Sequence, residues 1–72
     1  MNYQERLKEY FKNKGYKNKE LVVILGYSES MISRYLSGVK EINMGFLQSV
    51  ITHFPEVDLN YIFKGATHKL PS

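Results

Sequence analysis

A short stretch, residues 29–34, carries side chains suited to contact with nucleic-acid bases or with another protein. Its order, E-S-M-I-S-R, contains an acid, hydroxyls, a thioether and a guanidinium. Arg34 can pair bidentately with a guanine, Glu29 can accept from a cytosine amino group, and Ser30 can serve either kind of partner. Met31 is of a type favoured on adaptable protein-binding surfaces. The candidate recognition surface is therefore Glu29, Ser30, Met31, Ser33 and Arg34.

A helix with one buried face must hold these side chains. Apolar residues in the stretch recur at i, i+3 and i+4, namely Ile32, Tyr35 and Leu36. The preceding segment has the same spacing at Leu21, Ile24 and Leu25. Between the two segments, Gly26 permits the positive φ that ends a helix, and Ser28 can cap the next one. This pattern predicts a helix-turn-helix over about residues 18–37, whose second helix is the usual reader of the DNA major groove.

Length and composition favour one small globular domain without a membrane segment. The chain has 72 residues, 43% of them hydrophobic, which is enough for a modest core. No apolar run approaches the roughly 20 residues that a membrane helix needs, and the first residues do not resemble a signal sequence. We expect a cytoplasmic protein.

The net charge of +3 is unevenly placed along the chain. Residues 1–20 hold six basic and three acidic side chains, so the whole surplus falls there. Around the candidate recognition surface, Arg34 and Lys40 are matched by Glu29 and Glu41. Strong non-specific attraction to phosphates is not expected from that segment.

Three further helices are predicted around the motif. The first spans about residues 2–13, with Gly15 as its stop and an apolar face of Tyr3, Leu7, Tyr10 and Phe11. The fourth starts after the N-cap Asn43, ends before Pro55, and carries a stripe of Leu47, Val50, Ile51 and Phe54. The fifth, residues 59–63, is capped by Asp58 and closed by Gly65. We expect an all-α domain over residues 1–65 and a tail over residues 66–72.

One hydrophobic core should join these helices. The residues expected in it are Leu21, Leu25, Ile32, Tyr35, Leu47, Val50, Ile51 and Phe54. Aromatic side chains expected to be structural are Tyr10, Phe11, Phe46, Phe54 and Phe63. Tyr27 and Tyr61 can instead lie at the surface and join a protein interface.

Nothing in the sequence favours catalysis, a metal site or a cofactor. There is no cysteine, and neither His53 nor His68 has a paired carboxylate near it in the sequence that could complete a metal site. The chain has no nucleophile motif and no glycine-rich phosphate loop. We expect a non-enzymatic protein without a small-molecule substrate.

Residues 18–40 resemble the Cro/CI-type (XRE) helix-turn-helix family, whose characteristic run L-x-x-x-L-G-x-S-x-S-x-I-S-R-Y-x-S-G this segment closely follows. Residues 54–65, F-P-E-V-D-L-N-Y-I-F-K-G, resemble the last helix of the same five-helix domains. A domain of this length is similar to small regulators of temperate-phage lysis/lysogeny switches. These include Cro-like operator binders and the lactococcal-phage modulator-of-repression type, an antirepressor that binds the phage repressor.

The resemblance implies roles for individual residues. Glu29, Ser30 and Arg34 correspond to base-contacting positions, and contacts with phosphates or at the rim of an interface are implied for Lys17, Asn18, Lys19, Ser37, Lys40 and Asn43. The sequence departs from the family pattern at Glu29, where Gln is usual, at Met31, where a small polar residue is common, and at Val22, where Ala is usual. An acid that repels phosphates beside an apolar side chain suits another protein's basic helix as well as it suits DNA.

Two mechanisms follow for a transcription regulator in the cytoplasm of a bacterial host. In one, an antirepressor covers the DNA-reading domain of a phage repressor. In the other, a Cro-like homodimer places two recognition helices in successive major grooves, about 34 Å apart. An antitoxin or another partner-binding adaptor is a third class, and a toxin-like neighbouring gene would indicate it.

Overall fold

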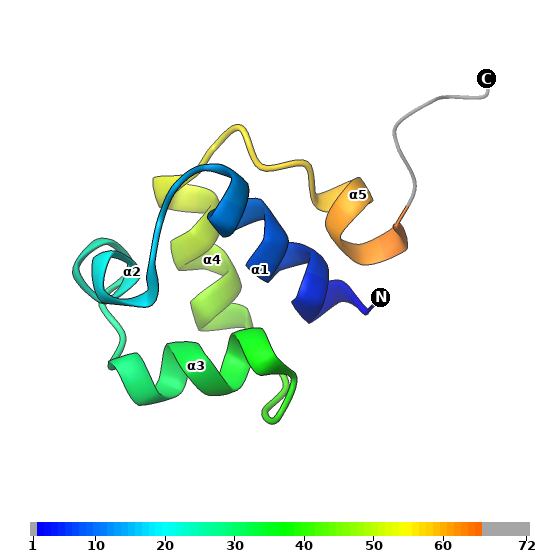
Figure 1. Cartoon of the computed structure of the whole chain (residues 1–72). Helices are drawn as coiled ribbons and strands as arrows, with labels where there is room; N and C mark the ends of the chain where they lie inside the picture. The colour runs from blue at the N-terminus through cyan, green and yellow to red at the C-terminus, as the bar shows by residue number, and fades with distance from the viewer. Residues whose placement is uncertain (1, 66–72) are drawn as a thin grey trace, which may run out of the picture.

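The structure is a computed structural model that describes residues 2–65. Within this range the regular secondary structure is entirely helical, as predicted (Figure 1). The five helices are α1 (Tyr3–Asn13), α2 (Asn18–Leu25), α3 (Glu29–Ser37), α4 (Met44–His53) and α5 (Leu59–Lys64). Helix α1 packs against α3 and α5, and α2 packs against α3 and α4. The tail expected over residues 66–72 lies outside the described residues, as does His68.

Local sequence signals start most of the helices. Asn2 Oδ1 accepts from the Glu5 N–H at 2.8 Å, and Glu5 Oε1 accepts from the Asn2 N–H at 3.2 Å, which forms a capping box. The expected caps Ser28, Asn43 and Asp58 each accept from backbone N–H groups at the start of α3, α4 and α5. Asn43 is therefore engaged in a helix cap. These boundaries follow from residues within a few positions of each helix end.

Several helix C-termini are instead tied down by side chains from other helices. Ser49 Oγ on α4 donates to the Leu25 carbonyl at the end of α2, at 2.9 Å. Gln4 Nε2 on α1 donates to the Tyr35 carbonyl in the last turn of α3, at 3.0 Å. Arg6 Nε donates to the Ile62 carbonyl of α5 at 2.7 Å. Since the last carbonyls of a helix have no partner within it, these bonds satisfy them and hold the helices together.

The core confirms most of the expected residues and corrects the face of α4. Buried apolar side chains are Leu7, Phe11, Leu21, Leu25, Ile32, Tyr35, Leu36, Phe46, Val50, Phe54 and Ile62. The prediction that Ile51 is in the core was wrong, because it is 39% exposed, and Leu47 is only half-buried. The apolar residues of α4 spread over nearly half of its circumference, so the pattern alone does not decide which of them point inward. The inward face is the one that carries Phe46 and the Ser49 hydroxyl.

Aromatic rings fill the space between α3, α4 and the preceding turn. The Tyr35 and Phe46 ring centroids are 4.5 Å apart, and Tyr27 meets Phe46 edge-on at 5.1 Å. Tyr27 is therefore a half-buried part of the packing. Phe63 was expected to be structural, but it is 44% exposed and stacks on Tyr3 at 5.1 Å, because neighbouring Ile62 takes the core position.

The Tyr35 hydroxyl is buried and has no hydrogen-bond partner among residues 2–65. Tyr35→Phe removes this unsatisfied O–H and keeps the ring, so we expect the free energy of unfolding to rise by roughly 1 kcal/mol. Tyr35→Ala removes the ring from a fully buried site and should cost roughly 3–5 kcal/mol. Urea unfolding of the two variants measures both changes. A Tyr35→Ala loss below about 1 kcal/mol would show that Tyr35 is not in the core.

A polar cluster joins the end of α1 to the segment between α4 and α5. Lys14 Nζ lies 3.0 Å from Glu56 Oε2, and the Tyr10 hydroxyl donates to the same oxygen at 3.2 Å. Lys14 holds the pKa of Glu56 below its usual range. Burial, reinforced by the hydrogen bond to Glu56 and its negative charge, raises the pKa of Tyr10 to about 12.

The Tyr10 shift predicts a loss of stability at alkaline pH. The folded pKa lies above the ordinary tyrosine value of 10.0, so the folded chain holds this proton more tightly than the unfolded chain does. Its contribution is fully present below about pH 10 and disappears as the pH rises toward 12. Ultraviolet titration should show one tyrosine that ionises at a pH well above the ordinary tyrosine value. Glu56→Gln should lower this pKa part of the way, whereas Glu41→Gln, in the segment between α3 and α4, should leave it unchanged.

Candidate functional site

The turn between α2 and α3 fixes how α3 leaves the body of the domain. Gly26 adopts φ +80°, and its N–H donates to the Val22 carbonyl at 3.1 Å. Two residues later, Ser28 Oγ accepts from the Met31 N–H at 3.2 Å and starts α3. Tyr27, between them, is pinned against Phe46. The predicted helix-turn-helix is therefore present with the expected cap and left-handed glycine.

Helix α3 divides sharply into a buried and an exposed face. Its inward residues are Ile32, Tyr35 and Leu36, which are at most 4% exposed. The predicted recognition residues that the structure leaves exposed are Glu29, Ser30, Ser33 and Arg34. Met31 was expected beside them, but it is half-buried and packs against the core. All five candidate residues thus lie on one helix, four of them exposed and Met31 partly buried beside them.

The candidate rim residues lie in two groups. Lys17 and Lys19 are exposed at the start of α2, where Asn18 is half-buried, and Lys40 is exposed after α3. Ser37 and Asn43 are exposed but already engaged within the chain. The Ser37 hydroxyl donates to the Arg34 carbonyl at 3.3 Å, and Asn43 Oδ1 accepts from the Phe46 N–H at 2.8 Å. Lysine side chains are therefore the rim groups most available for phosphate contacts.

The stretch from the end of α3 to the first residue of α4 carries two exposed apolar side chains that the motif did not indicate. Val39 is 77% exposed and Met44 is 65% exposed. The backbone of this stretch begins at Gly38, which has φ +87°. Two hydrogen bonds then hold it in place: the Lys40 N–H donates to the Arg34 carbonyl at 3.2 Å, and the Ile42 N–H donates to Tyr3 Oη at 3.3 Å. The side chains of Val39 and Met44 are thus exposed to solvent on a backbone that is held in place. The local residue pattern does not distinguish these two side chains from apolar residues that are buried.

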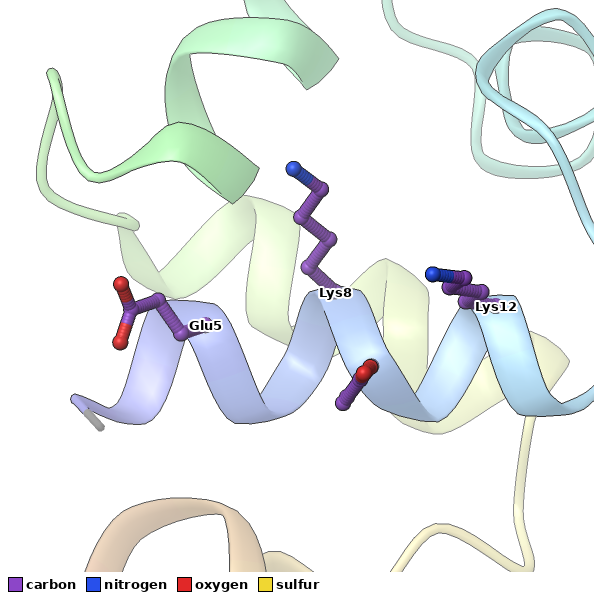
Figure 2. A pocket seen from close by; sticks show the side chains of 4 residues that line it. Glu5, Lys8 and Lys12 are labelled. Atoms are coloured by element: carbon purple, nitrogen blue, oxygen red, sulfur yellow. The ribbon is translucent and has the colours of Figure 1, made fainter.

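A solvent-open hollow lies elsewhere, along α1. Its lining residues are Glu5, Lys8, Glu9 and Lys12, which repeat at helical spacing along one helix. Figure 2 shows the labelled side chains Glu5, Lys8 and Lys12 projecting from α1 without converging on one point. A hollow formed by the side chains of a single helix has no groups from other elements to enclose a ligand. We regard it as a solvated charged face.

Other kinds of site find no support in the part of the chain that the structure describes. No three residues among His, Cys, Asp and Glu there are grouped to hold a metal ion. His53 Nδ1 lies 3.0 Å from the Ser49 carbonyl of the preceding turn. No helix within residues 2–65 is both long enough and apolar enough to cross a membrane.

Comparison with known families agrees with the geometry of the α2–α3 unit. A family model described as helix-turn-helix matches residues 7–62. The chain belongs to the helix-turn-helix family. This confirms the expected Cro/CI-type relationship and makes the chain a DNA-binding transcription regulator by family, of a kind that is generally non-enzymatic. No curated protein and no solved structure is matched by the chain.

The helix-turn-helix turn gives a direct test of the site's backbone. A Cβ added at Gly26 would meet nothing within 4 Å, so the cost of Gly26→Ala comes from the left-handed backbone alone. We expect a loss of roughly 1–2 kcal/mol in the free energy of unfolding, and a smaller loss for Gly26→Asn, which tolerates this conformation better. Denaturant unfolding measures both. An alanine variant as stable as the wild type would contradict the positive φ at this turn.

Proposed function

We propose that this helix-turn-helix protein is an antirepressor of a phage-type lysis/lysogeny switch in the cytoplasm of a bacterial host. Its α3 surface binds the DNA-reading domain of a repressor and keeps that domain from its operator. The observation that carries this proposal is the exposure of Val39 and Met44, at 77% and 65%. In a DNA-binding domain of this type, the segment after α3 is expected to meet phosphates, which favour cationic and polar side chains. Exposed apolar side chains there suit a protein partner instead.

The charge of this region supports the same conclusion. Between residues 21 and 65 the chain has three basic and four acidic side chains, so a DNA-facing surplus of positive charge is absent from this part of the sequence. Glu29 is exposed in the first turn of α3, where a negative charge interacts favourably with the helix dipole. A carboxylate there repels phosphates but complements the basic reading helix of a repressor.

Helix α3 also has the rigidity that a binding surface needs. Three buried side chains fix its inner face, so its outer residues are presented without a large ordering cost. Arg34 lies on the exposed face, and arginine is enriched among the residues that dominate protein interfaces. The proposed binding surface comprises Glu29, Ser30, Ser33, Arg34, Val39 and Met44.

A Cro-like homodimer that binds operator DNA is the second candidate. It is favoured by the exposed polar side chains Ser30, Ser33 and Arg34, which suit base edges, and by the DNA-binding character of the family. Lys17 and Lys19, exposed at the start of α2, would supply phosphate contacts in such a complex. On this alternative, Val39 and Met44 would lie beside the DNA backbone or in the contact between two copies.

Calorimetry against two probes separates these functions. The probes are the N-terminal domain of a repressor encoded beside this gene and a pool of DNA duplexes with a randomised core. Val39→Ser and Met44→Ser should each weaken repressor binding by about 1–2 kcal/mol, and Glu29→Gln should weaken it as well, since apolar area and a complementary charge are lost. Val23→Ser on α2 is the matched control, because Val23 is also highly exposed, at 82%, but lies outside the proposed surface.

The opposite pattern would establish direct operator binding. It consists of selection of one sequence from the pool at sub-micromolar affinity, together with no heat on adding the repressor domain. In that case Lys19→Ala should weaken binding to all sequences and flatten its salt dependence, whereas Arg34→Ala should mainly relax sequence preference. Glu29→Gln should then strengthen DNA binding or leave it unchanged, because it removes a negative charge near phosphates.

A further inference from the structure

Gln4 is a polar side chain buried on the core side of α1. It is only 5% exposed, and it lies one helical turn before Leu7 on the same face. Its amide Nε2 donates to two backbone carbonyls, Tyr35 at 3.0 Å and Lys40 at 2.6 Å. Both protons of the amide are thus used, on carbonyls more than 30 residues away in the sequence.

The two acceptors bracket the end of the recognition helix. The Tyr35 carbonyl is in the last turn of α3, where carbonyls have no partner within the helix, and Lys40 follows in the segment toward α4. The Lys40 N–H also donates to the Arg34 carbonyl at 3.2 Å, and this bond closes the turn that follows α3. One side chain from α1 therefore fastens both sides of the backbone turn that leaves α3.

We propose that Gln4 is a positioning residue for the recognition surface. By holding the last turn of α3 and the segment after it, its amide sets the orientation of Arg34 and the placement of Val39, although Gln4 itself touches no partner. The effect on binding rests on the proposed function of the α3 surface. The effect on the backbone around Lys40 does not, because it concerns the free protein.

The same helix supplies a matched control. Arg6 Nε donates to the Ile62 carbonyl at 2.7 Å and Arg6 Nη2 to the Phe63 carbonyl at 3.3 Å, so Arg6 fastens the end of α5 as Gln4 fastens the end of α3. Helix α5 carries none of the residues of the proposed binding surface. Loss of either fastening should destabilise the domain, but only the loss of Gln4 should disturb α3.

Amide hydrogen exchange followed by NMR tests the backbone effect without any ligand. In Gln4→Met, which keeps the length and loses the donor, we expect protection of the Lys40 N–H to fall at least about tenfold relative to the buried Ile32 N–H. The Gly65 N–H donates to the Tyr61 carbonyl at 2.8 Å. In Arg6→Met this N–H should lose protection, while the Lys40 N–H keeps its protection. Gln4→Asn keeps an amide that is too short to reach both carbonyls, and it should show a smaller loss at Lys40 if Gln4→Met does not fold.

Binding of the same variants tests the consequence. Whichever probe the wild type binds, the repressor domain or the selected duplex, Gln4→Met should bind it at least about fivefold more weakly under conditions where both proteins are folded. Arg6→Met should bind like the wild type. Equal loss of protection at all amides in Gln4→Met, with unchanged affinity, would overturn the proposal and leave Gln4 a general stabilising residue. Selective loss at Lys40 with no binding to either probe by the wild type would contradict the proposed function but not the positioning of α3.

Discussion

The arrangement of this domain depends on hydrogen bonds from side chains of one helix to the carbonyl ends of another. Five short helices have many unpaired terminal groups for the size of the core, and burying such groups without partners is costly. Gln4, Arg6 and Ser49 satisfy carbonyls of α3, α5 and α2 respectively. Each of these bonds gives a terminal carbonyl a partner and sets the place of its helix against a neighbour, while a left-handed glycine ends the helix itself. The hydrophobic core supplies the driving force for collapse, and these directional bonds select one arrangement of it.

The recognition helix α3 is held both by core packing and by hydrogen bonds. Its inner face is fixed by apolar side chains, its start by Ser28, and its end by a side chain from α1. The aromatic contact between Tyr35 and Phe46 also holds α3 against α4, which begins at the exposed Met44. A helix held at its face and at both ends has little freedom to adapt. Its partner must therefore match a preformed surface.

Local features of the fold could be predicted from the sequence, and features set by tertiary contacts could not. The bounds of α2 follow from its apolar spacing and from Gly26, because these signals lie within the segment itself. The face of α4 could not be chosen, since its apolar residues fit several faces and the selection depends on contacts with α2 and α3. At the site, the exposure of the polar residues of α3 followed from helical periodicity. The partial burial of Met31 and the exposure of Val39 and Met44 depend on contacts between segments that are distant in the sequence. These contacts could not be predicted from the local residue pattern.

The order in which the helix backbones pack differs from their order in the chain. Within residues 2–65 the close pairs form a series from α5 through α1, α3 and α2 to α4, with α3 at its middle. Helix α3 therefore has close neighbours in both halves, and the contact between Phe11 of α1 and Phe54 at the end of α4, with ring centroids 5.1 Å apart, joins the halves directly as well. A partner that immobilises α3 stabilises both halves of the molecule together, because opening of either half must disturb the bound helix. Under the proposed function, binding at α3 therefore also slows cleavage by a protease that requires local opening, even at residues far from the interface.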